Sequence, residues 1–505
     1  MRNRKTAVLL SYIMMIFEVL STLLLTPYII KTLGQAEYGV YKLSAAVVAY
    51  LLLLDLGVGN AVIRFTSKYR VSGDVLQGQK FAGVAIIYYI AIAIITVIIG
   101  VILIYTYPVI FAKGLNADEV ILGQRLLGIT VCNAALTLGT AVFANIIIAY
   151  EYFAFSRICS IIQIVIRIIM TVAVLRFNMG SVGIVTVNLI TTVLCRGTFV
   201  FFVFFKIKLK PVFHGIQLGF IKEIVVYSSL ILLQMIATQI NACADQILLG
   251  MLVTSSSVII AVYGVGTQIV QYFQSIGSAF NNVLMPGVVR MVEEDAGPDK
   301  LCNEMIRIGR IIFMVLGLIW GCFLVFGNQF VVLWAGSKNS QGYYVAAILM
   351  TAYTLILPQS IGTQILWAMN KHKEQAVLKI LIVIVNIVLT VLLIKWNPLI
   401  GATIGTFISL FLGDVGVMNL VFKLKIGIKL TKYYHGLFKG ILPSIFIAGV
   451  VGVLIKFIGL SGWIGLAINI GIMCIAYFAA MWVMGMNNSE KNMIRSVITK
   501  IGIRI

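Results

Sequence analysis

Two arginines interrupt apolar stretches that are long enough to cross a membrane. Arg167 lies within residues 154–176 and Arg196 within 181–205, each roughly 15–20 Å from the inner end of its stretch at helical rise. A guanidinium keeps its charge and needs an anion, a carboxylate or water at that depth. The pair predicts a cationic cavity that clamps a phosphate or carboxylate of a ligand. The alternatives are pairing with an intramembrane acid or, above all for Arg196, extension of the side chain toward the headgroups.

Acidic residues occupy similar stretches. Glu18 lies near the middle of the first, Asp55 in the second and Asp245 in the seventh. Such acids can couple transport to Na⁺ or H⁺, balance an arginine, or hydrogen-bond two helices together. Their spacing selects no sodium cage, so we expect no cofactor and leave the coupling ion open. Asp414, near the inner end of residues 398–421, is expected to be a solvated terminal residue.

Uncharged polar residues repeat at helical spacing on several stretches. The stripes are Thr130, Asn133, Thr137 and Thr140; Ser156, Ser160, Gln163, Arg167 and Thr171; Asn188, Thr192 and Arg196; Gln234, Thr238, Asn241 and Asp245; and Gln268, Gln271, Ser275, Ser278 and Asn282. Steps of three and four place each set on one helix face, which should meet protein or water rather than lipid. Interhelical hydrogen bonds of about 1 kcal/mol or less explain a few such residues. Stripes on at least four helices predict a hydrated cavity that suits a polyhydroxylated ligand.

A basic cluster closes the second stretch. Arg64, Lys68 and Arg70 follow its last apolar residues. Basic residues at an inner membrane face serve as topological anchors, and they can also capture a diphosphate headgroup first. The candidate substrate-binding residues are therefore Arg64, Asn133, Gln163, Arg167, Asn188, Arg196, Gln234, Asn241 and Gln271.

The elements that must position these residues are about fourteen membrane-spanning helices, each of roughly twenty residues. The predicted spans are 7–30, 40–63, 81–106, 121–147, 154–176, 181–205, 224–250, 257–285, 306–328, 343–368, 374–395, 398–421, 437–459 and 463–485. The first is interpreted as retained rather than cleaved. With both termini in the cytoplasm, most of the 38 Lys and Arg fall on the cytoplasmic side, as the positive-inside rule requires. Glycines at 57 and 59 should loosen the second span, and Pro358 should kink the tenth.

Composition excludes several classes of protein. Hydrophobic residues are 61% of the chain and charged residues 11%, which is typical of a polytopic membrane protein and not of a soluble domain. The net charge of +21 follows from topology and lipid attraction, so nucleic-acid binding is not expected. There is no phosphate loop and no H-E-x-x-H motif, and the seven cysteines contain no C-x-x-C pair. A nucleotide-driven pump, a metal site and an enzyme are therefore not predicted.

Short sequence echoes indicate an internal repeat. Tyr38-Gly39-Val40 returns as Tyr263-Gly264-Val265, and Asn145-Ile146-Ile147-Ile148-Ala149 is echoed by Gln364-Ile365-Leu366-Trp367-Ala368. The copies lie about 220 residues apart in the sequence. A repeat of this length implies two related halves, which is a common plan in transporters. We predict a six-helix bundle in residues 1–210, a second in 211–430, and two extra helices with a cytoplasmic tail in 431–505.

The N-terminal sequence resembles the polysaccharide-type, Wzx-like flippases of the multidrug/oligosaccharidyl-lipid/polysaccharide (MOP) exporter superfamily. The resemblance rests on Leu33-Gly34-Gln35-Ala36-Glu37-Tyr38-Gly39-Val40-Tyr41 and on Asp55-Leu56-Gly57-Val58-Gly59-Asn60-Ala61-Val62-Ile63-Arg64-Phe65. It implies two six-helix bundles facing each other in a V. It also implies alternating-access movement of an undecaprenyl-diphosphate-linked oligosaccharide to the outer leaflet of the cell membrane, for surface polysaccharide biosynthesis.

The resemblance leaves partners and rivals to be distinguished. The implied partners are the lipid-linked glycan and membrane lipids, with a functional monomer that associates with a polysaccharide polymerase or glycosyltransferases. The rivals are a lipid II-type flippase and a small-molecule or cation antiporter of the same superfamily. A cation carrier should have an acidic cavity, and the arginines of the first half argue against it. A polymerase or ligase needs a large outer loop, and the outer connections are short.

Overall fold

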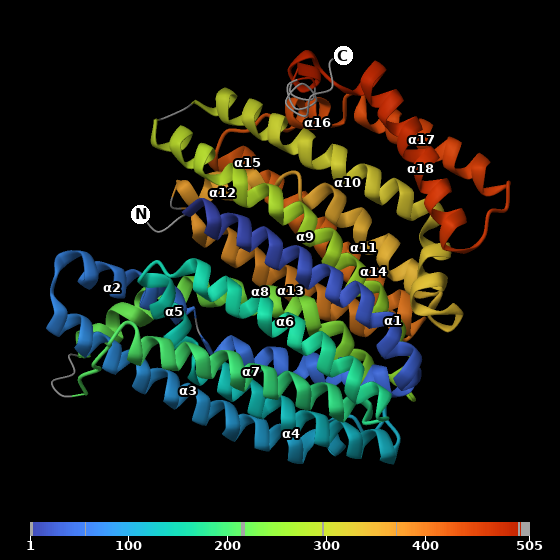
Figure 1. Cartoon of the computed structure of the whole chain (residues 1–505). Helices are drawn as coiled ribbons and strands as arrows, with labels where there is room; N and C mark the ends of the chain where they lie inside the picture. Colours follow the sequence, from blue (N-terminus) through green and yellow to red (C-terminus); the bar gives the residue numbers. More distant parts are fainter. Residues whose placement is uncertain are drawn as a thin grey trace. The chain divides into compact units, whose positions relative to one another are not determined.

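All regular structure in the described part of the chain is helical (Figure 1). The computed structural model describes residues 4–55, 57–213, 218–294, 297–369, 371–492 and 495; side chains are described for these except residues 4–9, 12, 218–234, 280–286, 289 and 372–374. A helix satisfies its backbone hydrogen bonds internally, which is what a chain this apolar needs in lipid. The predicted all-α class is confirmed.

The chain divides into two units. Unit 1 comprises Met1–Gly264 with Thr390–Ala402, and unit 2 comprises Val265–Leu389 with Thr403–Ile505. The helices of unit 1 are α1 (Arg4–Leu51), η1 (Leu52–Asp55), α2 (Val58–Ser72), α3 (Val75–Ile110), α4 (Ala117–Gly139), α5 (Ala141–Ala149), α6 (Phe153–Arg176), α7 (Gly180–Phe205) and α8 (Leu218–Leu252). Helices α9 (Ser257–Glu293), α13 (His372–Leu393) and α14 (Pro398–Leu410) contribute to both units. The predicted division into three segments stays a prediction.

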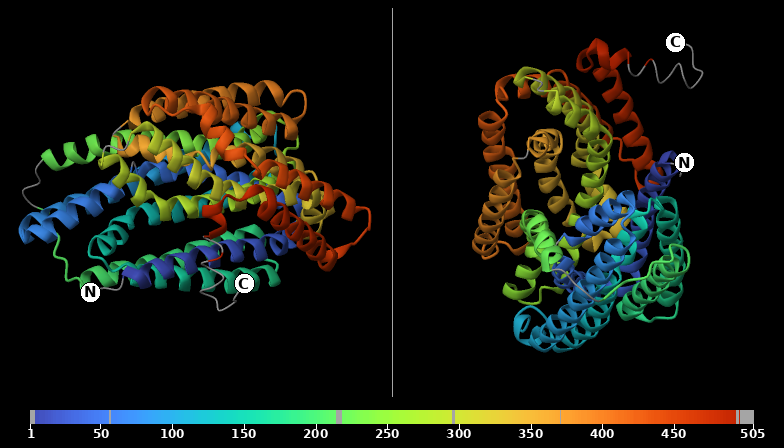
Figure 2. Two further views of the ribbon diagram at one scale, coloured as in Figure 1. Left: turned by 90° about the horizontal axis from the view of Figure 1, so that it is seen from above. Right: turned by 90° about the vertical axis from the view of Figure 1, so that its left-hand side faces the viewer.

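Unit 2 contains the remaining helices. They are α10 (Pro298–Ala335), η2 (Ser337–Asn339), α11 (Gly342–Ile356), α12 (Ser360–Ala368), η3 (Phe411–Val417), α15 (Met418–Lys425), α16 (Leu430–Phe438), α17 (Ile441–Lys456), α18 (Gly462–Ala480) and η4 (Met481–Gly485). Two of these, η3 and η4, are π-helical. The last two long helices, α17 and α18, pack side by side in both views of Figure 2.

Ten helical segments among the described residues are long and apolar enough to span a membrane, and the bent pair α11–α12 brings the number to eleven. One of them, Ile13–Ser72, covers most of the first predicted span and all of the second, and α8 and α9 coincide with the seventh and eighth. The chain is therefore a multi-pass membrane protein, and its helices are consistent with fourteen spans.

Glycines interrupt the helix at two places, between the first two predicted spans and within the second. Gly34 has φ 77° and ψ 172° and divides α1 into two helical runs. Further on, η1 tightens the helix into a 3₁₀ turn and Gly57 is left-handed at φ 71°, just before α2. Glycine adopts such angles without the Cβ clash that other residues meet. The predicted loosening of the second span is confirmed.

Close helix packing explains one glycine of the repeated Tyr-Gly-Val motif. A Cβ on Gly39 would lie 1.8 Å from the backbone oxygen of Ser257, at the start of α9. The first motif therefore brings α1 against α9 within unit 1. The kink at Pro358 is also confirmed, because α11 and α12 are bent by 44° on either side of it.

An apolar core in unit 1 includes residues of α7, and α6 packs against it. Phe81 and Tyr89 of α3, Ile146 of α5 and Val203 of α7 are buried in one cluster with α2. Aromatic stacking extends this core, with the ring centroids of Phe155 on α6 and Phe202 on α7 only 3.9 Å apart. This packing fixes α6 and α7 next to each other.

Candidate functional site

Four packed helices of unit 1 carry most of the candidate residues. Helix α1 contacts α4 and α6, and α7 contacts α4 and α6 (Figure 1). Within this group α4 carries Asn133, α6 carries Gln163 and Arg167, and α7 carries Asn188 and Arg196. All five side chains are half-buried. The structure thus brings these sequence-predicted residues onto neighbouring helices.

Neither arginine is neutralised by an acid among the side chains that the structure describes. Arg167 acts electrostatically on the Tyr41 hydroxyl of α1 and has no ion pair with a described carboxylate. The guanidinium of Arg196 lies over the Phe199 ring, 5.8 Å from its centroid. A cation over an aromatic face gains about 1 kcal/mol, far less than the cost of a buried charge. The two charges are therefore available to an anion.

The two arginines differ in the groups with which their guanidinium groups interact. Phe199 lies one turn further along α7, toward the end that the sequence places inside. The sequence leaves open that the Arg196 side chain extends toward the headgroups at this end instead of facing a cavity. Arg167 acts electrostatically on Tyr41 instead, and this tyrosine was not among the sequence-predicted site residues. Tyr41 could have been found from its place at the end of the Leu33–Tyr41 motif, one helical turn after Tyr38.

Amides and hydroxyls of the polar stripes behave differently. The hydroxyls of Thr130, Thr140 and Ser160 donate to backbone carbonyls four residues earlier in their own helices, at 2.6–3.0 Å. In contrast, Asn133 Oδ1 is buried without a hydrogen-bond partner among the described atoms. A buried acceptor without a donor costs about 1–3 kcal/mol, so it favours a ligand hydroxyl or water. The amides are therefore better candidates for ligand contacts than the hydroxyls.

Asp55 belongs to a local hydrogen-bond chain in unit 1. The Tyr89 hydroxyl donates to Asp55 Oδ1 at 2.7 Å, and Asn145 Nδ2 donates to the Tyr89 oxygen at 3.4 Å. A Cβ on Gly59 would come within 2.9 Å of Asn145 Nδ2, so glycine there admits the amide. Asp55 thus links the broken second span to α3 and α5. Its role in ion coupling stays a prediction.

Asp245 is the most deeply buried of the candidate acids, at 3% exposure. The Tyr263 hydroxyl donates to its Oδ2, and the Thr390 hydroxyl donates to its Oδ1 at 3.2 Å. All three residues belong to unit 1. Hydrogen bonds to a charged acceptor are worth about 1.5–3 kcal/mol each. This geometry makes Asp245 a connection between α8, α9 and α13, and leaves a coupling role untested.

We expect Asp245→Ala to lower the free energy of unfolding by about 2–4 kcal/mol, because both hydroxyls lose this acceptor in a buried site. Thermal unfolding of the detergent-solubilised protein measures the change. Asp118→Ala is the control, since Asp118 is exposed in the first turn of α4 and should change stability by about 1 kcal/mol or less. Equal melting temperatures for the two variants would contradict the assignment.

The remaining candidates are distributed as follows. Glu18 is exposed on α1, and Ser21 and Thr22 donate to its backbone oxygen rather than its carboxylate. Arg64 is exposed on α2 over the Phe65 ring. In unit 1 Asn241 is half-buried, and in unit 2 Gln271 is exposed and accepts a hydrogen bond from Gln268 at 3.2 Å. The side chain of Gln234 lies outside the described residues.

The expectation that Asp414 is solvated is wrong. It is 6% exposed, and the Lys379 ammonium on α13 donates to both of its carboxylate oxygens at 2.7 and 2.8 Å. The expectation rested on its place near the inner end of the span 398–421, and a place along one helix does not show that Lys379 of α13 packs against this position. Lys379 was likewise missed.

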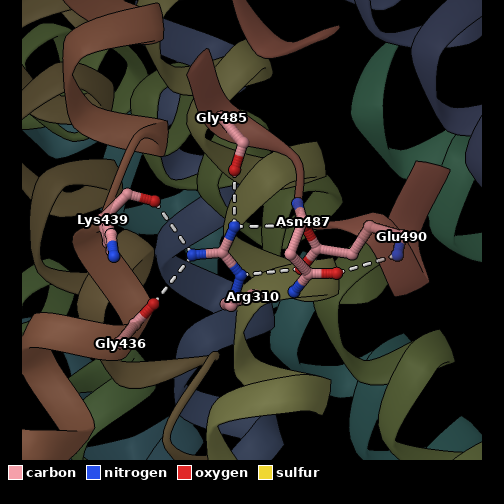
Figure 3. Close-up of polar contacts among 6 residues, drawn as sticks. All are labelled: Arg310, Gly436, Lys439, Gly485, Asn487 and Glu490. Atoms are coloured by element: carbon pink, nitrogen blue, oxygen red, sulfur yellow. Dashed lines mark hydrogen bonds and ion pairs between the residues drawn. The ribbon is translucent and has the colours of Figure 1, made fainter. Parts of the chain in front are cut away.

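A buried arginine in unit 2 was also missed (Figure 3). Arg310 on α10 donates to the carbonyl oxygens of Gly436, Lys439 and Gly485 at 2.6–2.9 Å, and to the Glu490 carboxylate at 2.7 and 3.1 Å. It therefore joins α10 to α16, to the start of α17 and to the segment after η4. The sequence places Arg310 where a predicted cytoplasmic loop meets the predicted span 306–328, and its partners come from residues more than a hundred positions away.

An apolar cavity of about 340 Å³ lies within unit 2. Its walls come from α9, α10, α11 and α18, and include Phe273, Phe323, Phe326, Met350 and Ile470. Such a cavity accepts hydrocarbon and offers nothing to a phosphate. No group of three or more His, Cys, Asp or Glu side chains that could hold a metal ion occurs in the described part of the chain.

Comparisons with known proteins identify a family and a shared fold. The sequence profile of a family described as "Polysaccharide biosynthesis protein" matches residues 4–292. No curated protein sequence matches the chain. Among solved structures, it resembles the lipid II flippase MurJ in an inward closed conformation, with a TM-score of 0.71 and 14% identity over 94% of this chain and 98% of that one.

Two further structures share the fold at low identity. A multidrug resistance MATE family transporter of the MOP superfamily, in an inward-facing conformation, has a TM-score of 0.64 and 14% identity over 80% of this chain and 96% of its own. A MOP superfamily transporter from Pyrococcus furiosus, described as having a binding pocket of reverse polarity, has a TM-score of 0.55 and 16% identity over 83% and 96%. At such identities the likeness establishes the fold alone.

Proposed function

We propose, from the premise that the chain belongs to the polysaccharide biosynthesis protein family, that it is a flippase for an undecaprenyl-diphosphate-linked oligosaccharide. It would carry the saccharide from the cytoplasmic to the outer leaflet of the cell membrane by alternating access, with both termini in the cytoplasm. The family supports a role in making polysaccharide, and the MOP fold supports transport rather than catalysis.

The observation that carries the proposal is the pair of arginines without a described carboxylate partner. Arg167 and Arg196 are half-buried on adjacent helices at membrane depth. A diphosphate-sugar headgroup cannot cross hydrocarbon unaided, because burying its charge costs tens of kcal/mol on an idealised scale. Fixed positive charge offsets that cost during transit. The same charges disfavour an organic cation, which argues against the antiporter alternative.

The amides suit the saccharide part of the ligand. Asn133, Gln163 and Asn188 are half-buried on the helices that carry the arginines, and Asn133 Oδ1 is a buried acceptor without a described partner. Sugar hydroxyls both donate and accept, so they can satisfy such groups. The apolar cavity of unit 2 suits a hydrocarbon segment, and each buried CH₂ contributes about 0.8 kcal/mol. In this scheme the polar head crosses beside the arginines while the lipid tail stays in the apolar phase.

The full-length protein reconstituted in liposomes tests the proposal. The probe is an undecaprenyl-diphosphate-linked oligosaccharide with a fluorescent sugar, and a membrane-impermeant quencher reports the leaflet that it occupies. We expect the protein to speed exchange at least ten-fold over empty liposomes. A parallel assay with lipid II separates the two flippase functions, since a preference for lipid II would replace the proposed substrate. Exchange at the empty-liposome rate for both lipids would refute the flippase.

A further inference from the structure

A short basic segment follows the last turn of α7 in unit 1. It comprises residues 206–210, in which Lys206, Lys208 and Lys210 alternate with Ile207 and Leu209, and we call it the lysine strap. All three lysines are exposed, whereas Ile207 and Leu209 pack against the apolar core of unit 1. The apolar side chains thus hold the strap to the protein, and the three lysines lie on its exposed side.

Backbone hydrogen bonds fix the path of the lysine strap. The Leu209 N–H donates to the Val203 carbonyl oxygen of α7 at 3.3 Å. Two residues past the strap, the Val212 N–H donates to the Gln79 carbonyl oxygen of α3 at 3.1 Å. The approach to α3 is close, because a Cβ on Gly83 would lie 2.2 Å from the Val212 oxygen. The lysines therefore project from a fixed backbone.

The usual roles of a basic residue at a helix end leave Lys208 and Lys210 unexplained. Lys206 is the C-cap of α7, where the helix dipole favours a cation, but this effect falls off within the last turn. A topological anchor needs only positive charge in the loop, whatever its backbone conformation. Lys208 instead has a φ of 56°, in the left-handed region that is unfavourable for a residue with a Cβ. Its charge is therefore held at a defined place.

The charge of the lysine strap is not balanced by a carboxylate among the side chains that the structure describes. The acids in the neighbouring turns of unit 1 have other partners. Asp74 accepts a hydrogen bond from the Gln77 N–H at the start of α3, and Glu151 pairs with Arg70 at 3.5 Å. Three fixed positive charges in a row favour an anion that bridges them.

The surface next to the lysine strap indicates which anion this is. Phe201 and Phe205, in the last two turns of α7, are 61% and 67% exposed, and their rings stack with centroids 4.2 Å apart. Helix α7 is apolar and long enough to span a membrane, so exposed rings on it face acyl chains. Rings followed by ammonium groups match the order of acyl chains and headgroups in a lipid leaflet. The apolar stem of a lysine lets its ammonium reach the phosphates.

We propose that the lysine strap binds anionic phospholipid headgroups, whose phosphates lie between neighbouring ammonium groups while the acyl chains lie against Phe201 and Phe205. Each lysine near an anionic membrane surface strengthens binding by about five-fold. A zwitterionic phospholipid carries its own cation, so it binds the strap less tightly. Salt weakens the interaction, because the lysines are exposed. The strap takes no part in moving a substrate, so this inference goes beyond the proposed function.

Chemical modification of lysines in the purified full-length protein tests the surface directly. The protein is placed in nanodiscs of phosphatidylcholine, with or without phosphatidylglycerol, and a water-soluble reagent acylates exposed lysines. Peptide mass spectrometry gives the rate for each lysine. We expect phosphatidylglycerol to slow acylation of the lysine strap by about ten-fold or more. Lys395 and Lys456 are exposed lysines that stand alone on other connections, and they report the general effect of an anionic surface.

Neutral variants separate the lysine strap from the total charge of the protein. Lys206→Gln/Lys208→Gln/Lys210→Gln should lower the affinity for phosphatidylglycerol by about ten-fold or more, as measured by native mass spectrometry of lipid-bound protein. A control variant removes the same charge from three exposed lysines on separate connections, and it should keep the wild-type affinity. The control variant is Lys113→Gln/Lys395→Gln/Lys456→Gln.

Lys208→Gly distinguishes lost binding from misfolding, since glycine adopts the left-handed conformation freely. It should unfold at the wild-type temperature or above and lose about five-fold in affinity for phosphatidylglycerol. Equal losses in the strap and control variants would overturn the proposal, as would strap lysines that phosphatidylglycerol protects no more than Lys395. Protection that arises in native membranes but not in the nanodiscs would identify a protein as the occupant, and the proposal would fail.

Discussion

Arg167→Ala is expected to abolish surface polysaccharide while leaving expression and membrane insertion intact. The arginine is half-buried in the middle of α6 and has no described carboxylate partner, so its loss removes a charge that only the ligand would balance. Truncating one partner of a desolvated charge pair costs about 2–5 kcal/mol, which corresponds to a loss of binding of about thirty-fold or more. Surface polysaccharide on complemented cells, with protein quantified in the membrane fraction, gives the measurement.

Two further variants of α6 serve as comparisons for Arg167→Ala. Arg167→Lys keeps the charge but loses the planar fork that binds phosphate with two hydrogen bonds, so partial activity is expected. Arg176→Ala removes an exposed arginine from the last turn of the same helix and should be silent. Full polysaccharide in Arg167→Ala would remove this residue from the site. Equal losses in Arg167→Ala and Arg176→Ala would point to the net charge of α6 instead.

Arg310→Ala is expected to cause the largest loss of stability among the variants considered. One guanidinium that is 6% exposed satisfies three backbone carbonyls and the Glu490 carboxylate (Figure 3). Breaking a buried pair by removing one partner costs about 3–5 kcal/mol, because the other charge stays buried without compensation. Thermal unfolding in detergent should show it, together with faster proteolysis within residues 436–492.

Arg307→Ala is the matched control on the same helix. Its side chain is 69% exposed and pairs with Glu304 at 3.4 Å, a geometry worth about 0.5 kcal/mol or less. Glu490→Gln should fall between the two, because the amide still accepts a hydrogen bond from Arg310. If Arg310→Ala and Arg307→Ala unfold at the same temperature, Arg310 does not hold α16 and the segment after η4 to α10.

Several features of the candidate site could be predicted because they depend on local spacing. Helical periodicity alone put Asn133, Arg167 and Arg196 on polar faces of apolar helices, and the structure finds them half-buried. The break near Gly57 and the bend at Pro358 follow from the conformations that glycine and proline allow. The assignment of these residues to a substrate cavity stays a prediction.

Contacts between distant segments could not be predicted in the same way. The Tyr263 and Thr390 hydroxyls reach Asp245 from other helices, and Glu490 reaches Arg310 across 180 residues. Asp414 shows this most clearly, since its place near the inner end of a predicted span indicates exposure, whereas the Lys379 ammonium of another helix contacts its carboxylate. Nothing in the order of residues specifies which helix faces will meet.

By itself the sequence determined that the chain is a multi-pass helical membrane protein, where its helices weaken, and that fixed positive charge lies at membrane depth. These follow from hydropathy and local backbone conformation, which act over a few turns of chain. Only the tertiary structure decided which charges are neutralised. Asp414 and Arg310 gain partners while Arg167 has no described acidic partner, because charge compensation in a low-dielectric interior depends on side chains brought within a few ångströms by packing.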